Sequence, residues 1–212
     1  MPSPTTEPPG TLRDWACALA MTTGRGPAAR AVADLAELGS TDVLVDVGCG
    51  PGTAAREAAR RGAAVTGVDP SPAARRLARC ITSLRRIRNV TFVDGTAESL
   101  PLPDGSATVL WSLSAYHHWT DHATGLAEAM RVLAPGGRLL VVEPAARAHG
   151  TGQVRVTGDR HGHGLCRYGI TEDGVGALAS ALGGAGFGGV RTERLQAGRR
   201  GFVAACASKP AA

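Results

Sequence analysis

Short apolar segments alternate with segments of helical periodicity along most of the chain. The apolar segments are short and contain many β-branched residues, which is typical of buried strands. The intervening segments carry apolar residues three and four positions apart, which is typical of helices packed on one face. The predicted strands are 42–48, 63–69, 90–95, 107–114, 137–144, 190–196 and 201–209, and the predicted helices are 11–22, 28–38, 52–62, 71–84, 122–134 and 171–186.

This alternation predicts an α/β fold with a doubly wound, mostly parallel sheet covered by helices on both faces. Segments 190–196 and 201–209 are close enough to pair as a C-terminal antiparallel hairpin. Ser71 and Pro72 are a natural cap and first residue for one helix, and we expect Pro135 and the two glycines after it to stop another. Ligands of such sheets bind beyond the carboxyl ends of the strands, so the residues that follow each strand carry the functional information.

The composition adds few constraints. The chain has 212 residues, of which 43% are hydrophobic, so it can form one well-buried core. The formal net charge is +5, and the densest basic stretch is 75–88. Its spacing favours the charged surface of a helix over a nucleic-acid patch, so we expect no nucleic-acid partner, although that alternative stays open.

The five cysteines are widely and irregularly spaced, and none shows the spacing of a zinc site. We therefore expect free thiols, no bound metal and a cytoplasmic location. The chain has no apolar segment long enough to span a membrane, and its first residues do not resemble a signal peptide. Residues 1–10 are rich in Pro and Thr, and we expect them to be disordered.

The strand 42–48 leads into the sequence DVGCGPG, which places three glycines at one bend. Glycines at such a bend allow a ligand to approach the backbone closely. A dinucleotide site would require a third glycine at Thr53, and a phosphate-binding loop would require a lysine that is absent here.

With Asp69 at the end of the next strand, this bend resembles the cofactor site of class I S-adenosylmethionine-dependent methyltransferases. The stretch 94–144 extends the resemblance to their small-molecule branch, which is similar to the enzymes of ubiquinone and menaquinone biosynthesis. It contains, in order, an LPLPD turn, a HH pair, an RVLAPGG turn and a VVEP strand end. The resemblance is detailed over about 40–145 and implies a Rossmann-like, seven-stranded sheet.

The resemblance implies S-adenosylmethionine as cofactor and S-adenosylhomocysteine as product. The glycines would let the backbone approach the amino-acid and ribose parts, Asp46 would favour the ammonium, and Asp69 would accept hydrogen bonds from the ribose hydroxyls. Thr96 stands where the family usually has an acid facing the adenine, and Glu98 or Asp94 could substitute. The implied cofactor residues are Asp46, Gly48, Cys49, Gly50, Gly52, Asp69, Pro70, Thr96, Ala97 and Ser112.

The acceptor side is less determined by the sequence. By family position His117 is the candidate base, and a purely structural role for His117 and its neighbour His118 is an equal alternative. His118 and His122 flank a predicted helix start, and we expect them to cap that helix rather than bind a metal. The candidate acceptor-binding residues are Trp15, Tyr116, His117 and Tyr168, with ordinary core packing as the alternative for the aromatic residues.

The leading hypothesis is a methyltransferase acting on a small molecule, as a monomer or homodimer. The alternatives are a cofactor-binding fold with altered or lost catalysis, an NAD-dependent reductase, and a basic nucleic-acid-associated module. We expect one domain over 11–212. Its parts are cap helices at about 11–39, a core at about 40–145, a lid segment at about 146–170, and a helix with strands at about 171–208.

Overall fold

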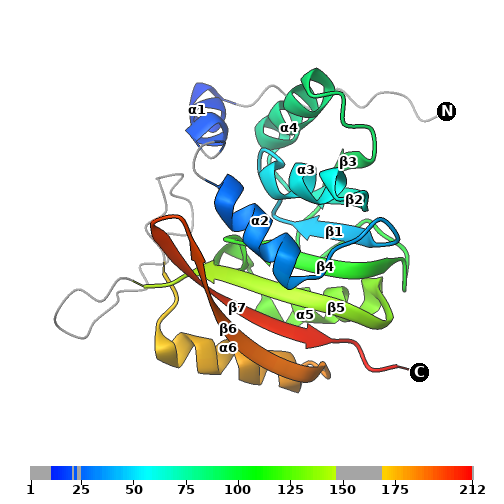
Figure 1. The fold of residues 1–212 in the computed structure, drawn as a ribbon, viewed down its shortest axis with the longest axis vertical. Helices are drawn as coiled ribbons and strands as arrows, with labels where there is room; N and C mark the ends of the chain where they lie inside the picture. Colours follow the sequence, from blue (N-terminus) through cyan, green and yellow to red (C-terminus); the bar gives the residue numbers. More distant parts are fainter. Residues whose placement is uncertain (1–10, 21, 23–24, 147–168, 212) are drawn as a thin grey trace.

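A computed structural model describes residues 11–20, 22, 25–146 and 169–211 of the chain (Figure 1). Its centre is a seven-stranded sheet in the order β3-β2-β1-β4-β5-β7-β6. β1 to β5 are all parallel, whereas β7 runs antiparallel to both β5 and β6. The strands are β1 (Val43–Val47), β2 (Ala64–Val68), β3 (Val90–Val93), β4 (Ala107–Leu113), β5 (Leu133–Pro144), β6 (Gly188–Ala197) and β7 (Arg200–Ser208).

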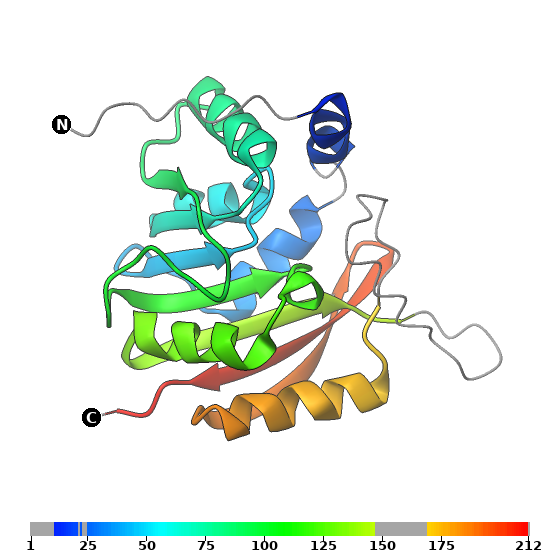
Figure 2. The same ribbon diagram turned by 180° about the vertical axis from the view of Figure 1, so that it is seen from behind.

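Helices cover both faces of the sheet, as the alternating pattern predicts (Figures 1 and 2). One face packs against α2, α3 and α4 through a buried cluster rich in alanine, and the other packs against α5 and α6 through a cluster rich in leucine and valine. The predicted fold class is therefore confirmed. The helices are α1 (Leu12–Ala20), α2 (Gly26–Leu35), α3 (Thr53–Arg60), α4 (Pro72–Leu84), α5 (His122–Val132) and α6 (Glu172–Gly184), and a short 3₁₀ helix, η1, spans Tyr116–His118.

The end of α5 differs from the prediction. The helix ends at Val132, because Leu133 is extended, fully buried and paired with Ala107 of β4. The segment with Pro135 and its two glycines therefore belongs to β5 rather than to a turn outside it. The backbone there is tied to the C-terminal strand, since the Lys209 N–H donates to the Gly137 carbonyl at 2.9 Å.

The sheet topology fixes where a ligand can bind. β1 pairs with β2 on one side and with β4 on the other, so the connections leave β1 and β4 in opposite directions. The loops after these strands therefore separate and leave a crevice at the carboxyl edge. The glycine bend, Asp69 and η1 all follow strands at this edge.

The division into cap, core and lid stays a prediction. Residues 1–10, most of the lid segment and Tyr168 lie outside the described residues. Within the described part of the chain, no helix combines the length and hydropathy needed to cross a membrane.

Candidate functional site

The glycine bend connects β1 to α3 through three residues with left-handed backbones. Gly48, Gly50 and Gly52 have φ values of 71°, 53° and 74°. A Cβ on Gly48 would clash with the Cβ of Ala115, and one on Gly52 would lie 2.6 Å from the Phe92 ring. A Cβ on Gly50 would meet no atom within 4 Å, although Gly50 itself is buried. Gly50 is therefore the member of the bend that borders open space.

Asp69 follows β2 and ties the glycine bend to the start of α4. Its carboxylate accepts the Gly50 N–H at 2.7 Å through Oδ2 and the Ser71 N–H at 2.9 Å through Oδ1. Burial raises the pKa of Asp69, while these two backbone hydrogen bonds oppose the rise. The carboxylate therefore lies directly beside the bend, at the tip of the second strand.

Asp46 lies under the bend, near the end of β1, and is only 1% exposed. Burial raises its pKa to about 7, the Trp111 side chain opposes this rise, and the nearby Asp69 carboxylate adds to it. Its Oδ2 atom has no hydrogen-bond partner within the described part of the chain. A buried carboxylate oxygen without a partner is costly, and this one is suited to a cationic ligand.

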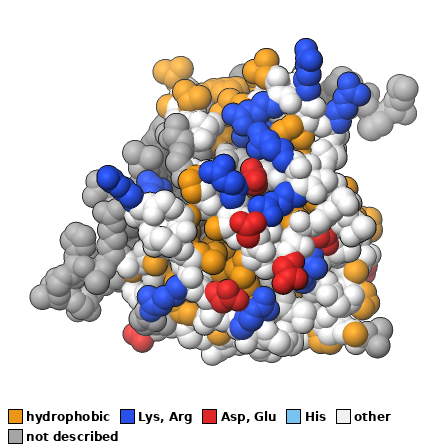
Figure 3. Space-filling model, in the orientation of Figure 1, with side chains coloured by type: hydrophobic (Ala, Val, Ile, Leu, Met, Phe, Trp, Pro, Cys, Tyr) orange, Lys and Arg blue, Asp and Glu red, His pale blue; other side chains and the backbone are white. Residues whose placement is uncertain are grey.

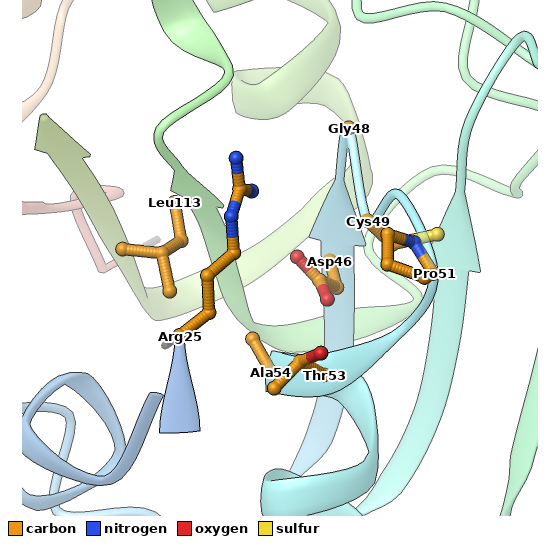
Figure 4. A pocket seen from close by; sticks show the side chains of 8 residues that line it. All are labelled: Arg25, Asp46, Gly48, Cys49, Pro51, Thr53, Ala54 and Leu113. Carbon is orange, nitrogen blue, oxygen red and sulfur yellow. The ribbon is translucent and has the colours of Figure 1, made fainter. Parts of the chain in front are cut away.

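A small pocket opens above Asp46, between the glycine bend and the end of β4 (Figure 4). Arg25, the residue before α2, extends its side chain along one wall of this pocket, and the Asp46 carboxyl group lies on another wall (Figure 4). The pocket thus brings together an anionic and a cationic group beside bare backbone. It is lined by Arg25, Asp46, Gly48, Cys49, Pro51, Thr53, Ala54 and Leu113.

Sequence reasoning missed Arg25. The residue lies in a Gly- and Pro-rich break, where hydrophobic periodicity gives no indication of which way a side chain points. The helix that begins beside it starts at Gly26, two residues earlier than predicted. Only the packing of that helix against the sheet places the guanidinium at the pocket.

The predicted adenine-side residues lie after β3. Thr96 is exposed and forms an isolated bridge with Ser99, whereas Ala97 is buried in the core on the α5 side. Glu98 and Asp94 both have partners inside the protein. Glu98 accepts the Thr120 N–H at 2.6 Å, and Asp94 pairs with the buried Arg75 at 2.7 Å. Neither carboxylate is thus an uncommitted substitute for the family's usual acid.

Two further predicted cofactor residues have opposite environments. Ser112 on β4 is fully buried, and its Oγ has no hydrogen-bond partner within the described residues. Pro70 is exposed at the turn between Asp69 and α4. Ser112 is therefore an internal polar group at the carboxyl edge, whereas Pro70 lies on its outer rim.

The HH pair forms part of η1, directly after β4, and its two side chains differ. The His117 ring places Nδ1 2.7 Å from Oε2 of Glu143, and both side chains are nearly buried. His118 is exposed. The structure thus separates the two histidines: the His117 ring contacts a buried carboxylate, whereas His118 is exposed.

The expected capping role of the histidines is wrong. Asp121 is the N-cap of α5, because its carboxylate accepts the N–H groups of Ala123 and Thr124 at 3.0 and 3.3 Å. His122 instead contacts the Tyr116 carbonyl through Nε2 at 3.1 Å. A carboxylate is the stronger acceptor for helix N–H groups.

The aromatic candidates for the acceptor side are not all brought together. The Tyr116 ring stacks on His122, with centroids 4.3 Å apart, and also contacts Trp119. Trp15 lies on α1, is 36% exposed, and belongs to a helix that packs against α4. Tyr168 is outside the described residues.

The basic stretch 75–88 forms α4 and its C-terminal end. Arg75 is buried and donates to the Asp69 carbonyl and to Asp94. For this residue the expected location on a solvated helix surface is therefore wrong. Exposed Lys and Arg side chains gather over the face that carries α3 and α4, with acidic side chains farther down the same face (Figure 3). Among the residues that the structure describes, no group of three or more His, Cys, Asp or Glu could hold a metal ion.

Comparison with known proteins finds a family model and several proteins that this chain resembles in sequence. Residues 45–141 match the family model described as a methyltransferase domain. The chain is 37% identical over 114 residues to demethylmenaquinone methyltransferase of Tropheryma whipplei, covering 54% of this chain and 46% of that protein. It is 35% identical over 135 residues to 27-O-demethylrifamycin SV methyltransferase of Amycolatopsis mediterranei, covering 60% of this chain and 50% of that protein. The chain thus spans about half the length of the curated relatives it matches.

A solved structure of similar shape comes from Aquifex aeolicus and is described as a SAM-dependent methyltransferase. Its TM-score is 0.72, with 16% sequence identity, over 92% of this chain and 98% of that chain. At this identity the likeness concerns the fold alone. Residues 45–141 of this chain therefore resemble the methyltransferase domain family, and the chain shares its fold with a solved SAM-dependent methyltransferase.

Proposed function

We propose that this protein is an S-adenosylmethionine-dependent methyltransferase that acts on a small molecule. The observation that carries the proposal is that Asp46 and Arg25 line the same pocket beside the glycine bend. The amino-acid end of S-adenosylmethionine carries an ammonium and a carboxylate, which match these two groups in charge.

The residues present fit this cofactor. The unpartnered Oδ2 of Asp46 is an acceptor suited to the ammonium, and the open side of Gly50 leaves room for the ligand against the backbone. The Asp69 carboxylate, at the tip of β2, is an acceptor suited to the two ribose hydroxyls. The adenine would lie next to Thr96 and Ala97, where a threonine hydroxyl replaces the carboxylate usual in the family.

S-adenosylmethionine, when bound, supplies a methyl group attached to a positively charged sulfonium. After transfer, the leaving group is S-adenosylhomocysteine, whose sulfur is neutral. The protein must then mainly align the acceptor with that methyl group and exclude water. In this proposal Asp46, Arg25 and Asp69 hold the cofactor, the backbone of the bend excludes water from one side, and His117 faces the acceptor as base. Trp15, Tyr116 and Tyr168 are the proposed acceptor-binding aromatic residues.

The matched relatives support the small-molecule class of acceptor. Their names state that they methylate demethylmenaquinone and 27-O-demethylrifamycin SV. We infer an acceptor of that general kind, an organic small molecule rather than a nucleic acid.

The direct test is a thermal-shift and calorimetry series with S-adenosylmethionine, S-adenosylhomocysteine and NADH. We expect both adenosyl compounds to stabilise the protein and NADH to leave it unchanged. A ligand present at a hundred times its Kd should add about 2.7 kcal/mol to the free energy of unfolding. Stabilisation by NADH alone, or by none of the three, would contradict the proposed function.

Replacing Asp69 with Ala should weaken the binding of S-adenosylhomocysteine by about tenfold to a hundredfold, since a charged hydrogen-bond acceptor is lost. Calorimetry would measure the change. Asp94→Asn is the matched control, because Asp94 also follows a neighbouring strand but is largely exposed and pairs with Arg75. Unchanged affinity in Asp69→Ala would remove Asp69 from the cofactor site.

Replacing Gly50 with Ala should impair ligand binding much more than folding. The left-handed backbone makes the substitution cost about 1–2 kcal/mol, but the new Cβ meets no protein atom within 4 Å. It would instead enter the space proposed for the cofactor and weaken S-adenosylhomocysteine binding at least about tenfold.

Gly198→Ala provides the matched control for this substitution. Gly198 lies between β6 and β7, has a φ of 63°, and also has no atom within 4 Å of a built Cβ. It should show the same loss of stability in chemical denaturation and unchanged ligand affinity. Equal affinities in the two variants would place the ligand away from Gly50.

A further inference from the structure

Glu143 is a fully buried carboxylate at the carboxyl edge of the sheet, near the end of β5. Its Oε1 accepts the backbone N–H of Tyr116 at 2.8 Å. Its Oε2 lies 2.7 Å from Nδ1 of His117. One buried side chain thus holds both the backbone and the imidazole of the loop that follows β4.

This loop borders the pocket of the glycine bend. Ala115, two residues before His117, is the residue that a Cβ on Gly48 would strike. Leu113, at the end of β4, lines the pocket itself. The Glu143 carboxylate therefore acts on a histidine next to the proposed cofactor site rather than on a remote part of the surface.

The chemistry of the contact determines where the imidazole proton lies. An ionised carboxylate only accepts hydrogen bonds, so the nitrogen that faces Glu143 must carry a proton. In the neutral imidazole this makes Nδ1 the donor and places the ring lone pair on Nε2.

We propose that Glu143 is a positioning residue that fixes His117 as the Nδ1–H tautomer, and that Nε2 of His117 serves as proton acceptor for a protic methyl acceptor. The inference rests on the proposed function and adds to it a positioning residue and a class of substrate. That class is a compound whose reacting atom carries a proton, namely a hydroxyl or an N–H group.

The proposed step balances in protons and electrons. The proton of the acceptor hydroxyl or N–H passes to Nε2 of His117, and the acceptor atom forms a bond to the methyl carbon. The carbon–sulfur bond breaks, and its electron pair stays on sulfur. His117 is then an imidazolium paired with the Glu143 carboxylate, which stabilises the charge until the proton passes to water. A carboxylate or tertiary-amine acceptor would have no proton to give and would not need this pair.

The variant Glu143→Gln separates the two contacts of this side chain. The Tyr116 N–H can only donate, so the glutamine must turn its carbonyl oxygen toward that group. Its NH₂ group then faces Nδ1 of His117 and donates to it. The loop contact is thereby kept, while the histidine is forced into the opposite tautomer, with the proton on Nε2.

The experiment is a two-bond ¹H–¹⁵N correlation spectrum of the ¹⁵N-labelled full chain, at a pH where the imidazole is neutral. The His117 signals are assigned by their absence in His117→Gln. We expect the Nδ1–H pattern in the wild-type protein and the Nε2–H pattern in Glu143→Gln. An Nε2–H pattern in the wild type, or the same tautomer in both proteins, would overturn the proposal.

Glu98→Gln is the matched control. Glu98 is also a carboxylate that holds this loop, and it does so through the N–H groups of Thr120 and Asp121. His117 should keep the wild-type tautomer in Glu98→Gln. A changed tautomer in this variant would show that the spectrum reports disorder of the loop rather than the contact with Glu143. Calorimetry with S-adenosylhomocysteine on the same samples tests the proposed function separately, because the tautomer can fail while the nucleoside still binds.

Discussion

Replacing Asp46 with Asn is expected to weaken S-adenosylhomocysteine binding about a hundredfold while making the folded protein more stable at pH 8. The loss of affinity follows because the amide removes the negative charge that faces the ligand ammonium. The gain in stability follows because the wild-type protein buries this carboxylate with one oxygen unpartnered. A ligand site that costs folding free energy is typical of functional residues.

The sign of the stability change follows from the pKa. Burial raises the pKa of Asp46 from 3.8 to about 7, so the folded protein binds this proton more tightly than the unfolded chain. The free energy of unfolding therefore falls as the pH rises from about 4 to about 7, by roughly 2–4 kcal/mol. Asp46→Asn should remove this fall and be more stable than the wild type above pH 7, as measured by urea denaturation at several pH values.

The same ionisation should govern ligand binding. If only the carboxylate form of Asp46 binds the ligand ammonium, affinity for S-adenosylhomocysteine should drop about tenfold between pH 8 and pH 6. In Asp46→Asn this part of the pH dependence should disappear. A wild-type affinity that is independent of pH over this range would contradict the assignment of the ammonium to Asp46.

Asp42→Asn is the matched control at the opposite end of β1. Burial alone would raise the pKa of the Asp42 carboxyl, but hydrogen bonds from Gly39, Thr108 and Arg138 outweigh it and lower that pKa. The ionised Asp42 therefore stabilises the folded protein at pH values above the pKa of Asp42 in the unfolded chain. This stabilisation is lost as the pH falls through the pKa of Asp42 in the folded protein. Asp42→Asn should therefore destabilise the protein at pH 8 and leave ligand affinity unchanged, the reverse of both effects of Asp46→Asn.

Replacing Arg25 with Ala is expected to weaken S-adenosylhomocysteine binding by about tenfold to a hundredfold, because the ligand carboxylate loses a charged partner. The affinity for 5′-methylthioadenosine should change less than about twofold, because that compound lacks the amino-acid end. Calorimetry with both compounds thus isolates the contact with the carboxylate from the rest of the site.

Arg30→Ala is the matched control for this substitution. Arg30 lies on α2, the helix that Arg25 precedes, but its side chain is exposed and does not line the pocket. It should bind both compounds like the wild type. Equal losses for the two compounds in Arg25→Ala would show that Arg25 supports the shape of the pocket rather than the ligand carboxylate.

The sequence was sufficient where the physical cause is local. A run of β-branched residues forms a strand in most contexts, and the three glycines after β1 predict a bend, in which Gly48, Gly50 and Gly52 do adopt left-handed backbones. The acids at the ends of β1 and β2 could be placed at one edge because parallel strands bring their carboxyl ends together. The fold class and the candidate positions of Asp46 and Asp69 could therefore be predicted.

The end of α5 could not be predicted in this way. Helical periodicity continues through Leu133, but pairing with Ala107 and burial under the sheet extend that residue instead. The histidine cap failed for a related reason, because Asp121 competes for the same helix N–H groups and its carboxylate is the better acceptor.

The sequence by itself determined the succession of strands and helices along the chain, the glycine bend and the acids beside it. Each of these depends on residues that are neighbours in the chain. Only the tertiary structure brought Arg25 to Asp46 and Glu143 to His117, across 21 and 26 positions of the chain. Such pairs are set by how helices pack on the sheet and by which strands lie adjacent, and periodicity within one element carries no information about either. The proposed charge match with the cofactor and the proposed tautomer of the candidate base therefore depend on the fold.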